Sequence, residues 1–194
     1  APVAAGEFAE PVRAWEGIPQ TVECTEFLDF ERAHEPGTEA PIGTRTWIVP
    51  AFAHPVGTAT MVPGLGAEHR RIMSAYERLA VFTPMVHDLT MGRVRPRGDL
   101  GVRIDYSPVE ADRREVAFGV VACAKLLFAA GAHSVFVPAG GLRVLSAGDD
   151  LDALQAQIAA DTPDLTAVHP MGSVPMGDDP SRSPVDSEGR HHHL

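Results

Sequence analysis

The segment after residue 161 contains the side chain best suited to chemistry, a histidine close to two glycines. The segment reads Ala167-Val168-His169-Pro170-Met171-Gly172-Ser173-Val174-Pro175-Met176-Gly177-Asp178-Asp179-Pro180. Imidazole titrates near neutral pH, so His169 could accept a proton from a hydroxyl group. Pro170 favours an extended backbone at His169, and Gly172 and Gly177 allow tight turns or close approach to a flat ring. The segment therefore predicts a general base on an irregular loop.

Two other interpretations of this histidine stay open. A single histidine in a loop is often hydrogen-bonded or solvated and has no chemical role. His169, Met171 and Met176 could also be soft ligands for copper, although no further Cys or His has a matching spacing. The terminal His191-His192-His193 run is assigned no metal, because adjacent side chains of an extended chain point in different directions.

The histidine segment and the residues after it resemble the C-terminal signature of the glucose-methanol-choline oxidoreductases. His169 is followed by Gly172-Ser173, by Gly177, and then by Val185-Asp186 before the turn Gly189-Arg190. The resemblance extends upstream to two further stretches: Glu10 to Gln20, and Ile104 to Ala132 with Asp112 before a long helix.

The resemblance implies an FAD-dependent enzyme that oxidises a CH–OH group, with hydride transfer to the flavin and His169 as general base. It places the flavin fingerprint upstream of this chain and a second catalytic His or Asn downstream of Leu194. The implied partner is therefore a flavin-binding domain of the same polypeptide, and the fragment alone is expected to be inactive. No cofactor-binding residue is assigned here, because Gly64-Leu65-Gly66 lacks the third glycine of a dinucleotide fingerprint and is expected to be a turn.

Other candidate residues are weaker. Trp47, Phe52 and Phe82 could line a pocket for an apolar alcohol, although aromatic residues in strands usually pack in the core. Cys24 and Cys123 have neither metal spacing nor a disulfide pattern, so we expect two free thiols. The other histidines are expected to be surface or hydrogen-bonded core residues: His34, His54, His69, His87 and His133.

Hydrophobic periodicity and capping signals predict three helices. The first runs from Ser107 to Ala130, where Ser107 and Glu110 suggest a capping box and Gly131 suggests the C-terminal cap. The others are expected at residues 67–80 and 151–160. Strands are expected at residues 3–8, 21–28, 44–49, 82–89, 92–95, 102–106 and 134–137. The short turns between residues 82 and 106 favour an antiparallel meander.

These elements predict an α+β fold, an antiparallel sheet with helices packed on one face. Residues 1–161 are expected to form this substrate-binding domain. Residues 162–194, rich in Pro and without apolar periodicity, are expected to be an irregular segment that leads back to the flavin-binding domain. The alternative is a non-enzymatic α+β ligand-binding or interaction module with a Pro-rich tail.

Composition excludes some classes of function. The 194 residues, 44% of them hydrophobic, suffice for one sizeable core. A net charge of −10 argues against a nucleic-acid surface. No run approaches the roughly 18 apolar residues that span a bilayer, and the first residues do not resemble a leader. On this basis we expect no membrane attachment and a cytoplasmic location.

Overall fold

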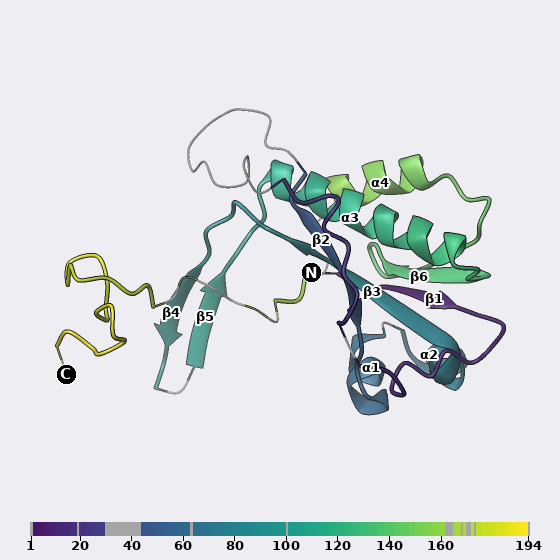
Figure 1. The fold of residues 1–194 in the computed structure, drawn as a ribbon, viewed down its shortest axis with the longest axis horizontal. Helices are drawn as coiled ribbons and strands as arrows, with labels where there is room; N and C mark the ends of the chain where they lie inside the picture. Colours follow the sequence, from purple (N-terminus) through teal and green to yellow (C-terminus); the bar gives the residue numbers. More distant parts are fainter. Residues whose placement is uncertain are drawn as a thin grey trace.

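The computed structural model describes residues 2–18, 20–29, 44–62, 64–99, 101–161, 165–167, 169, 172 and 174–193. The predictions for His34, Val168, Pro170, Met171 and Ser173 fall outside these residues. The fold is α+β, as expected, with an antiparallel sheet and α-helices (Figure 1).

The main sheet has five strands in the order β2-β3-β1-β6-β7. All four neighbouring pairs are antiparallel. The strands are β1 (Ala4–Glu7), β2 (Thr46–Ala51), β3 (Leu79–Val86), β6 (Ser134–Pro138) and β7 (Leu142–Leu145). β3 is the longest of them, and it bonds to β2 along one edge and to β1 along the other.

Two helices cover one face of this sheet. α3 (Glu110–Ala129) lies across the strands and α4 (Leu151–Ala160) packs beside it (Figure 1). The main core lies between them and the sheet, and it includes Ile48, Val120, Leu127, Val135 and Leu154. Close contact is possible because Gly119 has no side chain: a Cβ there would lie 2.5 Å from the Cβ of Pro84.

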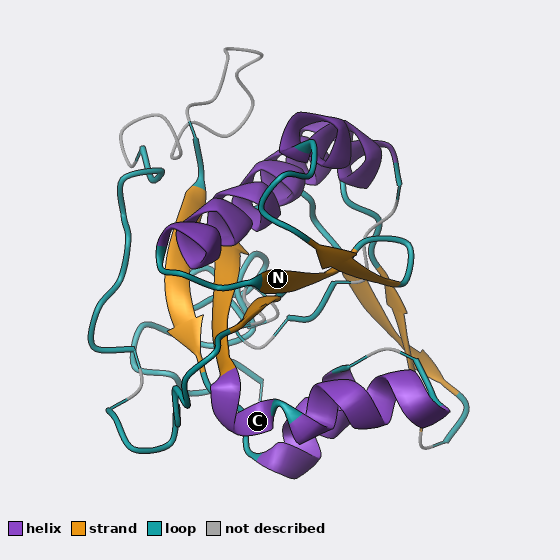
Figure 2. Cartoon of the chain, turned by 90° about the vertical axis from the view of Figure 1, so that its right-hand side faces the viewer, coloured by secondary structure: helices purple, strands orange, loops and turns teal. Residues whose placement is uncertain are grey.

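Shorter helices cover the opposite face of the sheet, although the sequence predicted helices on one face only. α1 (Pro55–Met61), α2 (Gly66–Ser74) and the 3₁₀ turn η1 (Tyr76–Arg78) lie on the other side of the strands from α3 and α4 (Figure 2). Ile72 of α2 and Ala75 after it form a second buried cluster with Leu79 of β3 and Phe136 of β6. The sheet is therefore sandwiched between a large core and a small one.

The predicted meander between residues 82 and 106 is wrong. β4 (Arg93–Arg97) and β5 (Gly101–Asp105) form a separate two-stranded sheet that projects away from the main one (Figure 1). β3 pairs with β1 and β2 and not with β4: β1 and β2 have buried side chains, whereas every residue of β4 is exposed. Only the antiparallel β4–β5 pair of the meander is present.

The long helix confirms one capping prediction and contradicts another. Gly131 has φ +99°, and the amides of Gly131 and Ala132 donate to the carbonyls of Phe128 and Leu127, which is a Schellman motif. The helix begins at Glu110, however, with Val109 as N-cap and no side-chain cap. The capping box of Ser107 does not form, because the amide of Val109 donates to Thr90 Oγ1 at 3.0 Å instead.

Local sequence signals predicted the bounds of α4 correctly and those of α2 only in part. α4 has the predicted bounds, and the carboxylate of Asp150 accepts the amides of Asp152 and Ala153. The helix predicted at residues 67–80 ends at Ser74, since Leu79 and Ala80 belong to β3. Gly64 and Gly66, both at positive φ, form the turn expected before it.

Three further differences concern short elements. Residues 21–28 form no strand and make only isolated bridges, Cys24 to Ile48 and Leu28 to Arg45. α1 and β7 were not predicted. α1 lacks apolar periodicity and begins through local contacts, since His54 Nδ1 accepts the amide of Gly57 at 3.2 Å. Within the described residues, no helix combines the length and the apolar character needed to cross a membrane.

Candidate active site

A cavity of about 380 Å³ lies on the sheet face opposite α3 and α4. Strand alternation explains its position: Ala4, Ala80 and Phe82 face the main core, so their neighbours point the other way. Described residues line it from the strands, from α1 and α2, and from the loops: Val3, Ala5, Ala14, Gln20, Ala51, Phe52, Ala53, Thr58, Met61, Val62, Ile72, Tyr76, Leu79, Val81, Thr83, Met85, Phe136, Val137, Leu142, Thr166 and His169.

The floor of the cavity is set by the register of three strands. Ala5 of β1 pairs with Val81 of β3 on one side and with Phe136 of β6 on the other. Directly paired residues of antiparallel strands project on the same face, so these three side chains form one row across the sheet. The row joins residues that lie more than a hundred positions apart in the sequence.

His169 lies at this cavity. Its side chain is exposed, and it lines the cavity together with Thr166 from the same segment. The rest of the lining comes from residues 3–142, so the C-terminal segment brings the imidazole to a surface built by the main sheet. The structure therefore places His169 next to an open cavity that could hold a small molecule.

The polar groups of the cavity are mostly bonded to the backbone. Tyr76 Oη donates to the carbonyl of Ala53 at 2.6 Å, and Thr58 Oγ1 donates to the same carbonyl at 3.1 Å. Burial raises the pKa of Tyr76, so its phenol stays neutral. Thr83 Oγ1 donates to the carbonyl of Pro2 at 2.9 Å. These contacts hold the wall in place, and His169 supplies the one imidazole among the described lining residues.

The rest of the signature forms turns. Gly172 has φ +83°, which a residue with a side chain rarely adopts. Gly177 has a different reason to lack a side chain, because a Cβ there would lie 2.6 Å from Ser183 Oγ. Asp186 Oδ1 accepts the amides of Glu188 and Arg190, each at 2.9 Å. In the structure, Asp186 therefore holds a turn.

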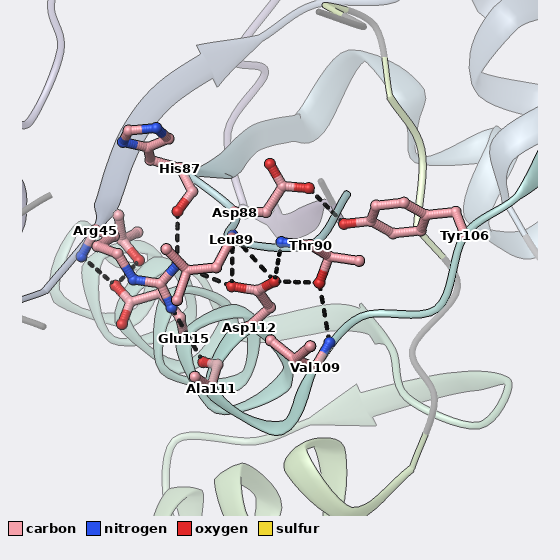
Figure 3. Close-up of polar contacts among 11 residues, drawn as sticks. Arg45, His87, Asp88, Leu89, Thr90, Tyr106, Val109, Ala111, Asp112 and Glu115 are labelled. Carbon is pink, nitrogen blue, oxygen red and sulfur yellow. Dashed lines mark hydrogen bonds and ion pairs between the residues drawn. The ribbon is translucent and has the colours of Figure 1, made fainter. Parts of the chain in front are cut away.

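Asp112, the residue noted before the long helix, is the centre of a buried network (Figure 3). Its carboxylate accepts Arg45 Nη1 at 2.8 Å, the amides of Leu89 and Thr90 at 3.0 Å, and the hydroxyl of Thr90. Burial alone would raise the pKa of Asp112, but the bonds from Thr90, Arg45 and Leu89 outweigh it and lower the pKa.

The same network joins the start of β2 to α3. Arg45 Nη1 also donates to the carbonyl of His87 at 2.6 Å, and Glu115 Oε1 accepts the Arg45 amide and the Thr46 hydroxyl. None of these residues lines the cavity. The network is therefore a structural clamp that holds α3 against the edge of the sheet.

The other candidate residues have mostly structural roles. Of the three aromatic candidates, Phe52 lines the cavity, whereas Phe82 packs against the main core and Trp47 is absent from the described lining. Cys24 and Cys123 are free thiols, as expected. In the described part of the chain, no cluster of His, Cys, Asp or Glu could hold a metal ion.

Four of the scattered histidines are described, and their contacts are local. His54 caps α1, and His69 Nε2 lies 2.9 Å from the carbonyl of Ala59. The main chain of His87 bonds to Arg45, and His133 lies 4.0 Å from Glu7. Tyr76 and Met61, by contrast, line the cavity and were not predicted as site residues, because nothing in the local sequence shows that α1 and α2 meet there.

Two comparisons with known proteins point to one family. The family model described as GMC oxidoreductase matches residues 88–194, more than half of the chain. Two uncharacterized GMC-type oxidoreductases, from two strains of Mycobacterium tuberculosis, are each 32% identical to this chain over 188 residues. The match covers 96% of this chain but 27% of each relative, so the chain spans little more than a quarter of their length. No solved structure matches significantly.

Proposed function

Because this chain belongs to the GMC oxidoreductase family, we propose that it forms the substrate-binding part of an FAD-dependent enzyme that oxidises a CH–OH group. In this proposal His169 is the general base, and bound flavin would supply the hydride acceptor. The observation that supports it is the position of His169 at a mostly apolar cavity, which could hold the carbon that is oxidised.

The proposed reaction needs one base and one hydride acceptor. His169 takes the hydroxyl proton while the C–H bond breaks with its electron pair, so the alcohol becomes a carbonyl compound. Bound flavin would supply the acceptor for that hydride. To act in this way, the imidazole must come within about 2.6–3.2 Å of the hydroxyl oxygen. An apolar cavity favours the reaction because it excludes water from the reacting carbon.

The described residues fit one part of FAD. The cavity offers an apolar wall and an imidazole, which suit the flat ring where hydride would arrive. No Arg or Lys is among the described lining residues, so nothing there would hold a pyrophosphate. The diphosphate and adenosine would therefore be bound by a flavin-binding region outside this chain. We retain as part of the proposal that residues 1–161 form the substrate domain, that residues 162–194 lead back to that region, and that the protein is cytoplasmic.

The test uses the full-length protein that carries this chain. The purified protein should contain one flavin per polypeptide, and anaerobic mixing with a suitable alcohol should bleach the flavin absorbance. The His169→Ala and His169→Gln variants should keep the flavin, while the rate of reduction falls roughly 10²- to 10⁴-fold.

The matched control is His133→Gln, because His133 lies beside Glu7 and does not line the cavity. This variant should reduce flavin at the wild-type rate. Equal rates in wild type and in both His169 variants would show that His169 is not the base. A full-length protein without flavin would favour the alternative of a non-enzymatic binding module.

A further inference from the structure

The lining of the cavity carries information about the substrate. Resting on the function proposed above, we propose that the alcohol is neutral and mostly apolar, and is neither a polyol nor a cation. The described lining residues include no Asp, Glu, Lys or Arg, and most of them are aliphatic, such as Val81, Ile72 and Leu142. A charged substrate group would therefore lose its water without gaining an opposite charge.

A polyol fits poorly because three hydroxyl protons of the wall are already used, which leaves few donors for its hydroxyl groups. Tyr76 and Thr58 both donate to the carbonyl of Ala53, and Thr83 donates to that of Pro2. Each hydroxyl has a single proton, so these groups could accept hydrogen bonds from a ligand but could not also donate. Several sugar hydroxyls would lose their water without gaining full partners, which disfavours their burial.

A quaternary ammonium alcohol does not fit either, although aromatic rings line the cavity. Recognition of such cations uses open faces of aromatic rings. The guanidinium of Arg71 lies 5.2 Å from the ring centre of Phe136, which already places a positive charge there. Tyr76 is stacked on Trp15 with ring centres 5.7 Å apart. Of the aromatic rings in the lining, Phe136 and Tyr76 therefore each have one face occupied, and Arg71 would repel a second cation next to Phe136.

The size of the cavity gives the expected trend within a series. Its volume of about 380 Å³ is near the small end of ordinary ligand pockets. Burying one methylene group contributes enough to change kcat/KM by about fourfold. For 1-alkanols, kcat/KM should therefore rise by that factor with each added carbon and level off once the cavity is full.

The first experiment compares alcohols with the full-length flavin-containing protein. Flavin reduction is measured for 1-butanol to 1-octanol, benzyl alcohol, D-glucose and choline. We expect kcat/KM to rise along the 1-alkanol series, and to be at least a hundredfold lower for glucose and choline than for 1-hexanol. Efficient reduction by glucose or choline would overturn the apolar substrate while leaving flavin-dependent alcohol oxidation intact.

A second readout does not depend on turnover. Isothermal titration calorimetry with 1-hexanol should show binding with a negative heat-capacity change, because apolar surface is buried. Val81→Phe should weaken the binding of 1-hexanol, because the larger side chain fills the floor of the cavity. Phe52→Ala should enlarge the cavity and move the preference to longer alcohols. Leu126→Ala, on the exposed side of α3, should change neither the affinity nor the preferred chain length. If 1-hexanol does not bind, or if Val81→Phe and Leu126→Ala bind it equally, the proposal is wrong whether or not the flavin is reduced.

A second, independent observation concerns the β4–β5 hairpin, whose two faces differ. The pairs Val94 with Ile104 and Pro96 with Val102 put their side chains on one face. Val94, Val102 and Ile104 are 61%, 67% and 68% exposed. We name Val94, Pro96, Val102 and Ile104 the apolar hairpin face. The opposite face carries Arg93, Arg95, Arg97, Arg103 and Asp105, and includes an Arg103–Asp105 ion pair at 2.7 Å.

We propose that the apolar hairpin face packs against the flavin-binding region of the same polypeptide; this inference also rests on the function proposed above. An isolated two-stranded hairpin is marginally stable in water, so a covering surface is needed. Among the described elements, β4 and β5 have substantial contacts only with each other. The matched relatives are almost four times as long as the region they share with this chain, which leaves ample chain to supply that cover.

The test is thiol labelling of the full-length protein. Val102→Cys, on the apolar hairpin face, should react at least tenfold more slowly than Arg103→Cys on the opposite face, while light scattering shows a monomer. Equal labelling rates would overturn the proposal. Protection of Val102→Cys that disappears when a dimer dissociates would also overturn it, because the cover would then be a second copy. Since flavin reduction is not measured, this test can fail while the proposed function stands.

Discussion

The network around Asp112 allows a prediction that can be worked out from contacts. Asp112 is 1% exposed, and the Arg45 side chain that it contacts is 3% exposed. Asp112→Asn keeps the shape of the side chain but removes the charge. The guanidinium of Arg45 would then be buried without its carboxylate partner, and the Asn amide could not accept all the bonds from Leu89 and Thr90.

The expected loss of stability follows from the burial of the ion pair. Removing one partner of a buried ion pair costs about 3–5 kcal/mol, because the other charge remains buried. An exposed pair contributes about 0–1 kcal/mol. The Asp105→Asn variant provides the control, since Asp105 pairs with Arg103 on the exposed hairpin. We therefore expect Asp112→Asn to lower the free energy of unfolding by about 3–5 kcal/mol and Asp105→Asn by less than about 1 kcal/mol.

Two measurements check this in the full-length protein. Urea denaturation gives the loss of stability, and hydrogen exchange shows whether protection is lost around Leu89 and Thr90, whose amides bond to Asp112. If Asp112→Asn costs no more than Asp105→Asn, or leaves exchange around Leu89 and Thr90 unchanged, the clamp does not have the assigned role.

The same carboxylate predicts a pH dependence. The pKa of Asp112 is lowered from 3.8 in the folded protein, so its ionised form stabilises the fold. That contribution is fully present above the ordinary aspartate pKa of about 3.9 and is lost as pH falls through the lower folded value. The stability difference between wild type and Asp112→Asn should therefore be constant near neutral pH and shrink below pH 4. A difference that grows with acid would have the wrong sign.

Two further predictions concern the main core. Gly119→Ala should destabilise the protein by about 1–3 kcal/mol in urea denaturation, because the clash of a methyl group 2.5 Å from the Cβ of Pro84 outweighs the gain in helix propensity. Gly148→Ala serves as the control and should be nearly neutral, because a methyl group there would meet open space. Burial raises the pKa of Cys123 to about 12, so Ellman's reagent should label the less buried Cys24 first, and equal rates would contradict the placement of Cys123 in the core.

Local signals predicted the elements that are fixed locally. The bounds of α4 and the end of α3 follow from Asp150 and Gly131, whose capping contacts involve only neighbouring residues. The start of α3 was wrong because Thr90, far away in the sequence, supplies the contact that Ser107 was expected to make. The end of α2 was wrong because Leu79 fits a helix face as well as a strand, and pairing of β3 with two partners decides between them.

The candidate site also has one part that local sequence predicts and one part that depends on the fold. The signature around His169 is contiguous, so the sequence could indicate a base there. The cavity wall could not be predicted, because Ala5, Val81 and Phe136 become neighbours only through the register of three strands. The aromatic candidates show the limit: Phe52 reaches the cavity, while Phe82 points to the opposite face and packs in the main core.

The central claim is that an alcohol bound in this cavity gives its hydroxyl proton to His169. It is tested most directly by a crystal structure of the full-length protein with flavin and a slowly reacting alcohol such as a trifluorinated 1-alkanol. We expect the alkyl chain to lie against Val81 and Phe136, with the hydroxyl oxygen within about 3.2 Å of the imidazole. A structure with flavin in place and the alcohol outside the cavity, or with its hydroxyl away from His169, would contradict it.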